Sequence, residues 1–453
     1  MSSLLAHGIG AVRDLPVPMW LFYYGSGIAL IVSFAALGAL WRKPVLERAE
    51  PRPAGAALSR VVLGPELRVL LGAVSLGLLA LVFAAALLGR ESIATNIAPT
   101  FVYVIFWVGL VPVVVLFGNV WPALNPWNAA ARAVGWVASR VAPPWRPPAR
   151  YPERPGRWPA AVLLLAFVTL ELAYPDSAAP RTLALAIALY TWITWLGMAV
   201  FGREQWLRHG EAFSVYFGLL SLLSPFTVRD GRLALRVPLS GIARRDATPG
   251  TVAFVAIMLG SVAFDGLSST RPWQERLFSI EAALALDNPG LADLALMGFN
   301  LLGLLGSVAL VALIFLVAVE GARLAAKGEG HLADEFVLSL VPIALAYAIA
   351  HYLTLLLIQG QAIWRLISDP FGYGWNLFGT AGYEIDLEVL SPNAIWYLQV
   401  GALVLGHVAA LVVAHDRAVA LFGSAAAALR TQYAMLVLMI AYTVGGLWSL
   451  STA

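Results

Sequence analysis

Five polar side chains interrupt long apolar stretches of this sequence and are the first candidates for chemistry. They are Glu171, Asp265, Asn300, His351 and His407. An ionisable group in a membrane-spanning helix is costly unless it faces the interior of the helix bundle, so such groups are functional candidates by default. A histidine oriented by a carboxylate can act as a general base, and histidines with carboxylates can also bind a metal ion.

We expect His351 to be the catalytic base and Asp265 to be the residue that orients it. A divalent metal ion is the alternative source of an activated water. Its candidate ligands are Asp265, His351, Glu171 and His407. Asn300 and Gln359 are expected to line the substrate cavity. Each group also has a structural interpretation, because carboxylates cap helix ends and lone histidines often bond within a bundle.

The expected depths of these residues favour one shared cavity. At 1.5 Å of helical rise per residue, all but His407 fall in the outer third of their helices. The sequence therefore predicts a polar cavity open to the outside, with His407 at its floor. A haem would need two histidines at matched depth, and His351 and His407 differ by about 9 Å, which disfavours haem.

The composition predicts an all-α integral membrane protein. Of 453 residues, 60% are hydrophobic and 12% are charged, against about 45 to 50% and about 25% in soluble domains. The absence of cysteine excludes disulfides, thiolate nucleophiles and iron-sulfur clusters. A net charge of +3, with the basic residues scattered among apolar runs, gives no reason to expect nucleic-acid binding.

Ten apolar runs are long enough to be considered as membrane-spanning helices, since a span needs about 20 residues. They lie near 19–41, 67–89, 98–118, 159–174, 182–201, 249–267, 294–320, 336–359, 393–414 and 431–450. The fourth run is the shortest. The whole chain, 1–453, is expected to form a single transmembrane domain.

Basic residues predict the orientation of this bundle, because cytoplasmic connections are enriched in Arg and Lys. With both termini outside, 23 of the 29 basic residues fall on the cytoplasmic side. The first run is expected to be retained, since its basic cluster follows it and does not precede it. The excess of arginine over lysine is typical of a GC-rich bacterial genome, so we expect a bacterial plasma membrane.

The connections between the spans carry further structure. Segment 121–158 is expected to be cytoplasmic, with an interfacial helix over 126–141 and then a linker rich in Pro and Arg. A second interfacial or re-entrant piece is expected at 204–224. Segments 268–293 and 360–392 are expected to be extracytoplasmic. The first of these contains an amphipathic helix, and the second is rich in aromatic residues, which would either fold as a cap or anchor the chain at the interface.

The inner end of the ninth run contains His415-Asp416-Arg417. The position of this triplet next to a connection predicts a solvated helix end with a structural role.

Three segments of the chain resemble those of a bacterial multi-pass family. They are Asn-Val-Trp-Pro-Ala-Leu-Asn-Pro-Trp at 119–127, Phe-Asp-Gly-Leu-Ser-Ser-Thr at 264–270, and the region 406–416 with Gly-His-Val and Ala-His-Asp. Members of this family are often labelled fenitrothion hydrolase, an activity against a lipophilic organophosphate triester. The likeness covers most of the chain. It implies hydrolysis of a small lipophilic ester, although a man-made pesticide is not expected to be the native substrate, and it implies no particular catalytic residues.

Two other functions remain open from the sequence. The chain could be a permease for a small solute or ion, or a subunit of a membrane-protein complex with no chemistry of its own. Against transport, the sequence has no clear inverted repeat and no pair of broken helices at matching positions. The lipid bilayer is the expected partner in every case.

Overall fold

Helices dominate the architecture of the computed structural model. The structure describes residues 18–141, 143, 145–243, 245, 247–286, 288–326, 332–423 and 425–452. In this part of the chain, nine helices are long and apolar enough to cross a membrane. The prediction of an all-α, multi-pass helix bundle is therefore confirmed.

The membrane-spanning candidates correspond closely to the predicted apolar runs. Their helices are α1 (Met19–Leu40), α2 (Ala56–Leu63) continued by α3 (Pro65–Leu88), α4 (Ile97–Pro99) with η2 (Thr100–Val108) and α5 (Leu110–Phe117), α9 (Pro180–Phe201), α13 (Thr251–Ser268), α15 (Pro289–Ala326), η4 (Val337–Leu340) with α17 (Val341–Leu357), α19 (Pro392–Phe422) and α20 (Ala425–Thr452). The fourth predicted span is α8 (Trp158–Ala173), which has only 16 residues. Its length is about 24 Å at 1.5 Å per residue, which is less than the thickness of the bilayer hydrocarbon.

Two glycines explain how the chain leaves the third and fifth spans. Gly118 follows α5 with φ 90°, and Gly202 follows α9 with φ 86°. This left-handed region strains residues with a Cβ, so glycine permits a sharp exit there. The chain turns at once into the short helices α6 (Trp121–Leu124) and α10 (Arg203–His209).

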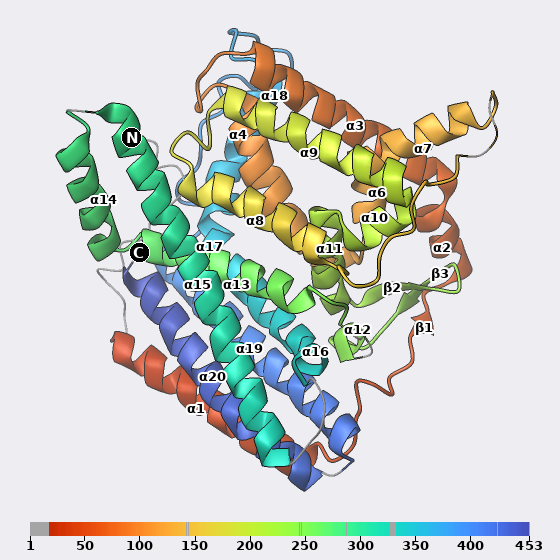
Figure 1. Ribbon diagram of the computed structural model, residues 1–453, viewed down its shortest axis with the longest axis vertical. Coiled ribbons are helices and arrows are strands. Elements are labelled where there is room, and N and C mark those ends of the chain that lie inside the picture. The colour runs from red at the N-terminus through yellow and green to blue at the C-terminus, as the bar shows by residue number, and fades with distance from the viewer. Residues whose placement is uncertain are drawn as a thin grey trace.

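The helices form two groups that meet at the centre of the molecule (Figure 1). In the first group, α1 packs against α19 and α20, while α20 also contacts α15 and α15 contacts α13. In the second group, α3 packs against α9 and α7 (Pro126–Ala138). The short helices α8 and α11 (Ala212–Leu220) connect the groups, because α8 contacts α13 and α15 and α11 contacts α17.

The connections also contain a small antiparallel sheet that the sequence reading missed. Its strands are β1 (Arg52–Pro53), β2 (Phe226–Arg229) and β3 (Arg232–Leu235), in the order β1-β3-β2. The hairpin between β2 and β3 turns at Asp230 and Gly231, both with positive φ. An Asp-Gly pair is a strong signal for this kind of turn.

The remaining helices are short. They are η3 (Ser221–Leu223), α12 (Ser240–Ala243), α14 (Arg271–Leu284), α16 (Leu332–Phe336), η5 (Gln359–Gln361) and α18 (Ala362–Ser368). The helix expected over 126–141 corresponds to α7, and the outer amphipathic helix corresponds to α14. Segment 204–224 is largely buried: α11 has seven buried residues and packs against α5, α8 and α17.

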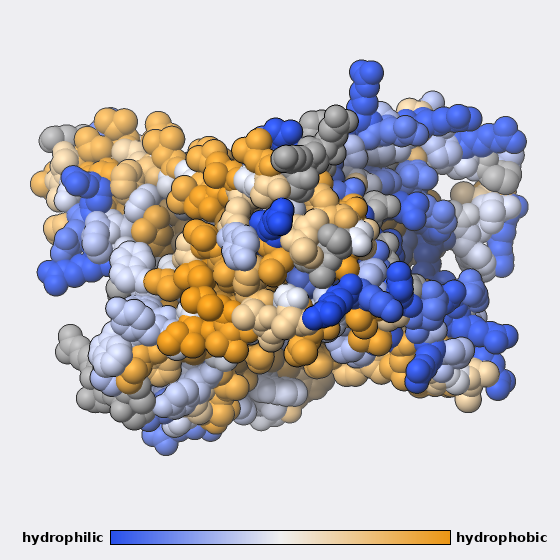
Figure 2. All heavy atoms as spheres, turned by 90° about the horizontal axis from the view of Figure 1, so that it is seen from below, coloured by the Kyte–Doolittle hydropathy of each residue, from blue (hydrophilic) through white to orange (hydrophobic). Residues whose placement is uncertain are grey.

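The surface matches a protein that lies in a bilayer. Figure 2 shows hydrophobic side chains spread across the central part of one face, with hydrophilic side chains concentrated toward one end. On α15, for example, Leu302, Leu313 and Val317 are each more than half exposed. Large apolar side chains exposed along a spanning helix are expected where the solvent is hydrocarbon.

Candidate functional site

The structure brings together the two predicted catalytic residues. His351 on α17 places Nε2 2.8 Å from Oδ2 of Asp265 on α13. The hydroxyl of Tyr352 donates to the same carboxylate oxygen at 3.0 Å. Both partners are shielded, with 14% of the His351 side chain and 4% of the Asp265 side chain exposed. Two residues separated by 86 positions in the chain thus form one buried pair.

The hydrogen-bond pattern sets the roles of the imidazole nitrogens. An ionised carboxylate can only accept hydrogen bonds, so with Asp265 ionised and His351 neutral the ring proton lies on Nε2 of His351. The Nδ1 atom of the neutral ring then carries the lone pair. This arrangement, a histidine whose tautomer is fixed by a carboxylate, is the one that general-base catalysis requires.

Local sequence explains why adjacent residues can reach one carboxylate. His351 and Tyr352 project about 100° apart around α17, because an α-helix has 3.6 residues per turn. Asp265 lies in the last turn of α13, where the hydroxyls of Ser268 and Ser269 donate to its backbone carbonyl at 2.8 and 2.9 Å. These bonds stabilise the helix end that carries the carboxylate.

Glu171 supplies a second carboxylate to the same region. It lies on α8, within the range of electrostatic interaction with Asp265 and Tyr352. In the described part of the chain, its buried Oε2 atom has no hydrogen-bond partner. A buried carboxylate oxygen without a donor is unusual, because the free energy of desolvation is then not recovered. Glu171 is therefore part of the candidate site.

His407 does not join this site. It is fully buried on α19, where its Nδ1 lies 2.7 Å from the carbonyl oxygen of Leu403 in the same helix. Its ring packs edge-on against Tyr347, with 6.0 Å between the ring centroids. The sequence gives the depth of a histidine along its helix but not the direction in which its side chain points. The prediction that placed His407 at the cavity floor rested on depth alone.

The predicted metal ligands do not come together as a set. Among the residues that the structure describes, no group of three or more His, Asp or Glu side chains is placed to hold a metal ion. Asp265 and His351 instead satisfy one another directly. The residues present therefore do not fit a divalent-metal site, and the chemistry considered below uses the side chains alone.

Asn300 and Gln359, predicted to line the cavity, line neither of the two cavities described below. Asn300 on α15 instead accepts a hydrogen bond from the indole of Trp273 at 3.0 Å. This bond attaches the amphipathic helix α14 to α15, so the side-chain amide of Asn300 holds two helices together. Gln359 lies in η5, just beyond the end of α17.

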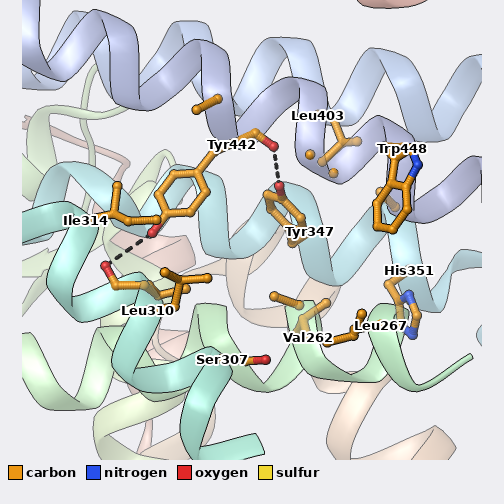
Figure 3. A pocket seen from close by; sticks show the side chains of 16 residues that line it. Val262, Leu267, Ser307, Leu310, Ile314, Tyr347, His351, Leu403, Tyr442 and Trp448 are labelled. Carbon is orange, nitrogen blue, oxygen red and sulfur yellow. Dashed lines mark hydrogen bonds between the residues drawn. The ribbon is translucent and has the colours of Figure 1, made fainter. Parts of the chain in front are cut away.

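A first cavity of about 280 Å³ lies beside His351 (Figure 3). Its walls come from α13, α15, α17, α19 and α20, and most of the side chains are apolar. The polar exceptions are Ser307, Tyr347, His351 and Tyr442. The two tyrosine hydroxyls already donate to backbone carbonyls, Tyr347 to Tyr442 at 2.6 Å and Tyr442 to Val311 at 3.2 Å. His351 lies at one end, next to Leu267 and Trp448.

A second cavity of about 220 Å³ lies on another side of α17. Tyr352 lines it together with Trp107 and Tyr216, which come from η2 and α11. The segment η2 is a π-helix of nine residues, a rare structure that is often found at functional sites. Through His351 and Tyr352, the Asp265 carboxylate is thus connected to two cavities.

Glu211 forms a separate polar cluster that the sequence reading missed. This fully buried carboxylate precedes α11 and caps its first turn. It accepts hydrogen bonds from Trp121 Nε1, Asn125 Nδ2, Tyr190 Oη, Ser214 Oγ and the backbone amides of Phe213 and Ser214. All of these donors are neutral, and they connect α6, α7, α9 and α11. The signal available in the sequence was a Glu directly after Gly210, at the start of an apolar helix.

The triplet His415-Asp416-Arg417, near the C-terminal end of α19, corrects another expectation. His415 and Asp416 were expected to be solvated, but both are fully buried. Asp416 accepts hydrogen bonds from the Trp41 indole and from the backbone amides of Val45, Leu46 and Glu47. Arg417 forms ion pairs with Glu47 and Glu335. The chain after α1 folds over this helix end and excludes water from it.

Basic side chains gather near the beginning of α8. Burial, together with the charges of Arg245 and Arg208, lowers the pKa of Arg157 to about 10. Burial also lowers the pKa of His209, and the neighbouring Arg157 and Arg208 charges act in the same direction. The His209 ring stacks on Tyr151 with 5.2 Å between centroids. His209 therefore favours its neutral form in the folded protein.

Comparisons of this chain with the profiles of known protein families, with curated proteins and with solved structures found no match.

Proposed function

We propose that this protein is a hydrolase of the bacterial plasma membrane that cleaves a small lipophilic ester. The observation that carries the proposal is the 2.8 Å contact between His351 Nε2 and Asp265 Oδ2, formed by a histidine that also lines a cavity. The resemblance of the segment containing Asp265 to a hydrolase-labelled family supports the same reaction class.

In the proposed reaction, His351 acts as general base on a water molecule in the first cavity. The water proton moves to Nδ1 while the oxygen forms a bond to the phosphorus or carbonyl carbon of the ester. The bond to the leaving group then breaks, and its electron pair goes to the departing oxygen. This oxygen takes the proton back from the imidazolium. Asp265 keeps Nε2 protonated throughout and stabilises the positive charge of the ring.

The test is turnover of a neutral lipophilic phosphotriester by the purified protein in lipid nanodiscs. Removal of a general base costs about 10²- to 10⁴-fold in rate, so we expect losses of this size in His351→Ala and a large loss in Asp265→Asn. His407→Gln is the matched control, because that buried histidine bonds within its own helix. Equal rates in wild type, His351→Ala and Asp265→Asn would contradict the proposal.

One observation favours a second function, a proton-linked permease. Glu171 has a buried oxygen with no hydrogen-bond partner among the described residues, and it lies within electrostatic range of the Asp265 carboxylate. Carboxylates and histidines clustered within a bundle are typical of proton relays. A permease would show solute flux into proteoliposomes that Glu171→Gln abolishes, with no ester turnover in the wild type. The hydrolase would show turnover in detergent, where no gradient exists.

A further inference from the structure

We infer that the first cavity receives its ligand sideways from the bilayer hydrocarbon, through an opening between α15 and α20, and that this ligand is an uncharged lipophilic molecule. The identification of the ligand as a substrate rests on the proposed function. The route of entry rests on the geometry alone.

The rim of the cavity faces the region where lipid must lie. Leu310 on α15 is 56% exposed, and Trp448 on α20 is 49% exposed, and both line the cavity. Leu310 is close to the middle of the 38-residue helix α15. An exposed leucine at this depth of a spanning helix contacts hydrocarbon. An opening bounded by Leu310 therefore leads into the bilayer.

Two adjacent glycines shape the α20 side of this opening. At Gly446, an added Cβ would collide with the Tyr347 hydroxyl, so this glycine leaves room for the Tyr347 ring beside α20. At Gly445, an added Cβ would meet nothing within 4 Å. Gly445 is exposed and lines the cavity. The missing side chain at Gly445 leaves space at the rim.

The lining determines the chemical class of the ligand. A charged solute would lose its hydration on entry and would need a partner of opposite charge. Among the described residues that line the cavity, His351 alone is of the acidic or basic types Asp, Glu, Lys, Arg and His. Because the Tyr347 and Tyr442 hydroxyls already donate to backbone carbonyls, they add little capacity for polar recognition. Ser307 adds one neutral hydroxyl. The cavity therefore favours a largely apolar, uncharged molecule with a polar group directed at His351.

The size of the first cavity fits a ligand that enters it with only part of its length. A volume of about 280 Å³ is slightly below the range of small-molecule sites, which begins at about 300 Å³. A longer molecule would place its polar end beside His351 and leave its apolar remainder between α15 and α20, in contact with lipid. Such a ligand would not have to pass through water to reach the site.

The test is photolabelling in nanodiscs with an uncharged alkyl ester that carries a diazirine, followed by peptide mapping. We expect wild-type labelling on α15, α17 and α20 next to the cavity, and at least a tenfold loss in Gly445→Phe, whose ring fills the rim. Gly306→Phe is the matched control. Gly306 is an exposed glycine of α15 that does not line the cavity and has nothing within 4 Å of its added Cβ, so its labelling should persist.

Further variants and a second probe distinguish the possible outcomes of this experiment. Gly445→Ala leaves the opening free and should label like wild type, which distinguishes blockage from misfolding. Unchanged labelling in a folded Gly445→Phe, or equal labelling of the same peptides by a water-soluble charged diazirine, would overturn the inference. Labelling that persists in an inactive His351→Ala supports entry from lipid independently of turnover. If the wild type labels as expected but hydrolyses no ester, only the proposed reaction fails.

Discussion

A single oxygen atom, Oδ2 of Asp265, organises the candidate site. It contacts both His351 Nε2 and the Tyr352 hydroxyl. In the proposed reaction the two donors differ: His351 is the base in the first cavity, whereas Tyr352 helps to hold the carboxylate. The geometry therefore predicts unequal effects when each contact is removed.

Tyr352→Phe removes one donor and keeps the ring. We expect a loss of roughly 1 kcal/mol in the free energy of unfolding, the usual net value of one hydrogen bond, and less than a tenfold fall in turnover. Unfolding in denaturant and steady-state kinetics measure the two effects. A rate loss as large as that of His351→Ala would mean that Tyr352 takes part in the chemistry directly.

His209 gives a pH-dependent prediction. Its pKa is below the ordinary value of 6.5 in the folded protein. Between the two pKa values, the unfolded chain therefore binds a proton at His209 that the folded chain does not. Stability should therefore fall as the pH drops below about 6.5 toward the lowered folded pKa. Thermal unfolding at pH 7.5 and 5.5 should show a smaller loss in His209→Gln than in wild type. The same pH dependence in both proteins would contradict this assignment.

The limits of sequence reading are clear at the residue scale. Depth along a helix was enough to pair Asp265 with His351, since both interrupt apolar runs near the same end. Depth did not give rotation about the helix axis, so His407 was grouped with them although it bonds to Leu403. Glu211 was missed because its donors come from four helices that only the tertiary fold brings together.

At the scale of elements, the C-terminal part of α19 holds the segment that follows α1. There the Asp416 carboxylate accepts hydrogen bonds from the backbone amides of Val45, Leu46 and Glu47, at 2.6 to 3.1 Å. Hydrogen bonds to a charged group are stronger than neutral ones, and buried amides that lose their acceptor are costly. The strength of this contact comes from a burial that the sequence did not reveal.

Asp416→Ala leaves those amides without their acceptor. We expect a loss of at least about 3 kcal/mol in the free energy of unfolding, since several buried donors become unpaired together. Asp334 is exposed on the neighbouring helix α16, so Asp334→Asn should change the free energy of unfolding by no more than about 0.5 kcal/mol. Chemical unfolding in nanodiscs or micelles compares the two. Equal stabilities would show that Asp416 does not hold the segment.

Element prediction succeeded where the hydrophobic pattern was long and failed where it was short. Nine of the ten predicted runs became helices long enough to span a membrane, while α8 ended after 16 residues at Tyr174 and Pro175. The small sheet was overlooked because its strands have two to four residues, too few for an alternating pattern. The turn at Asp230-Gly231 was the one signal that could have found it.

At the scale of the whole molecule, the distribution of basic residues predicts which side faces the cytoplasm. The native chain contains no cysteine, so an introduced cysteine is the only thiol. In intact cells, an impermeant maleimide should label Glu388→Cys and leave Arg150→Cys unlabelled until the membrane is permeabilised. Both positions are exposed in the structure. Labelling of Arg150→Cys from outside would reverse the orientation and would place the His351 end of α17 toward the cytoplasm.

The attachment of the chain after α1 to α19 has a consequence for biosynthesis. The Val45 amide and its acceptor Asp416 are 371 residues apart. At a ribosomal speed of about 5 to 20 residues per second, Asp416 emerges roughly 20 to 70 seconds after Val45. During that delay the first helix has been inserted but lacks its final neighbours. Nascent protein should therefore depend on the insertion machinery, or on a chaperone of the bilayer, to shelter α1 until α19 arrives.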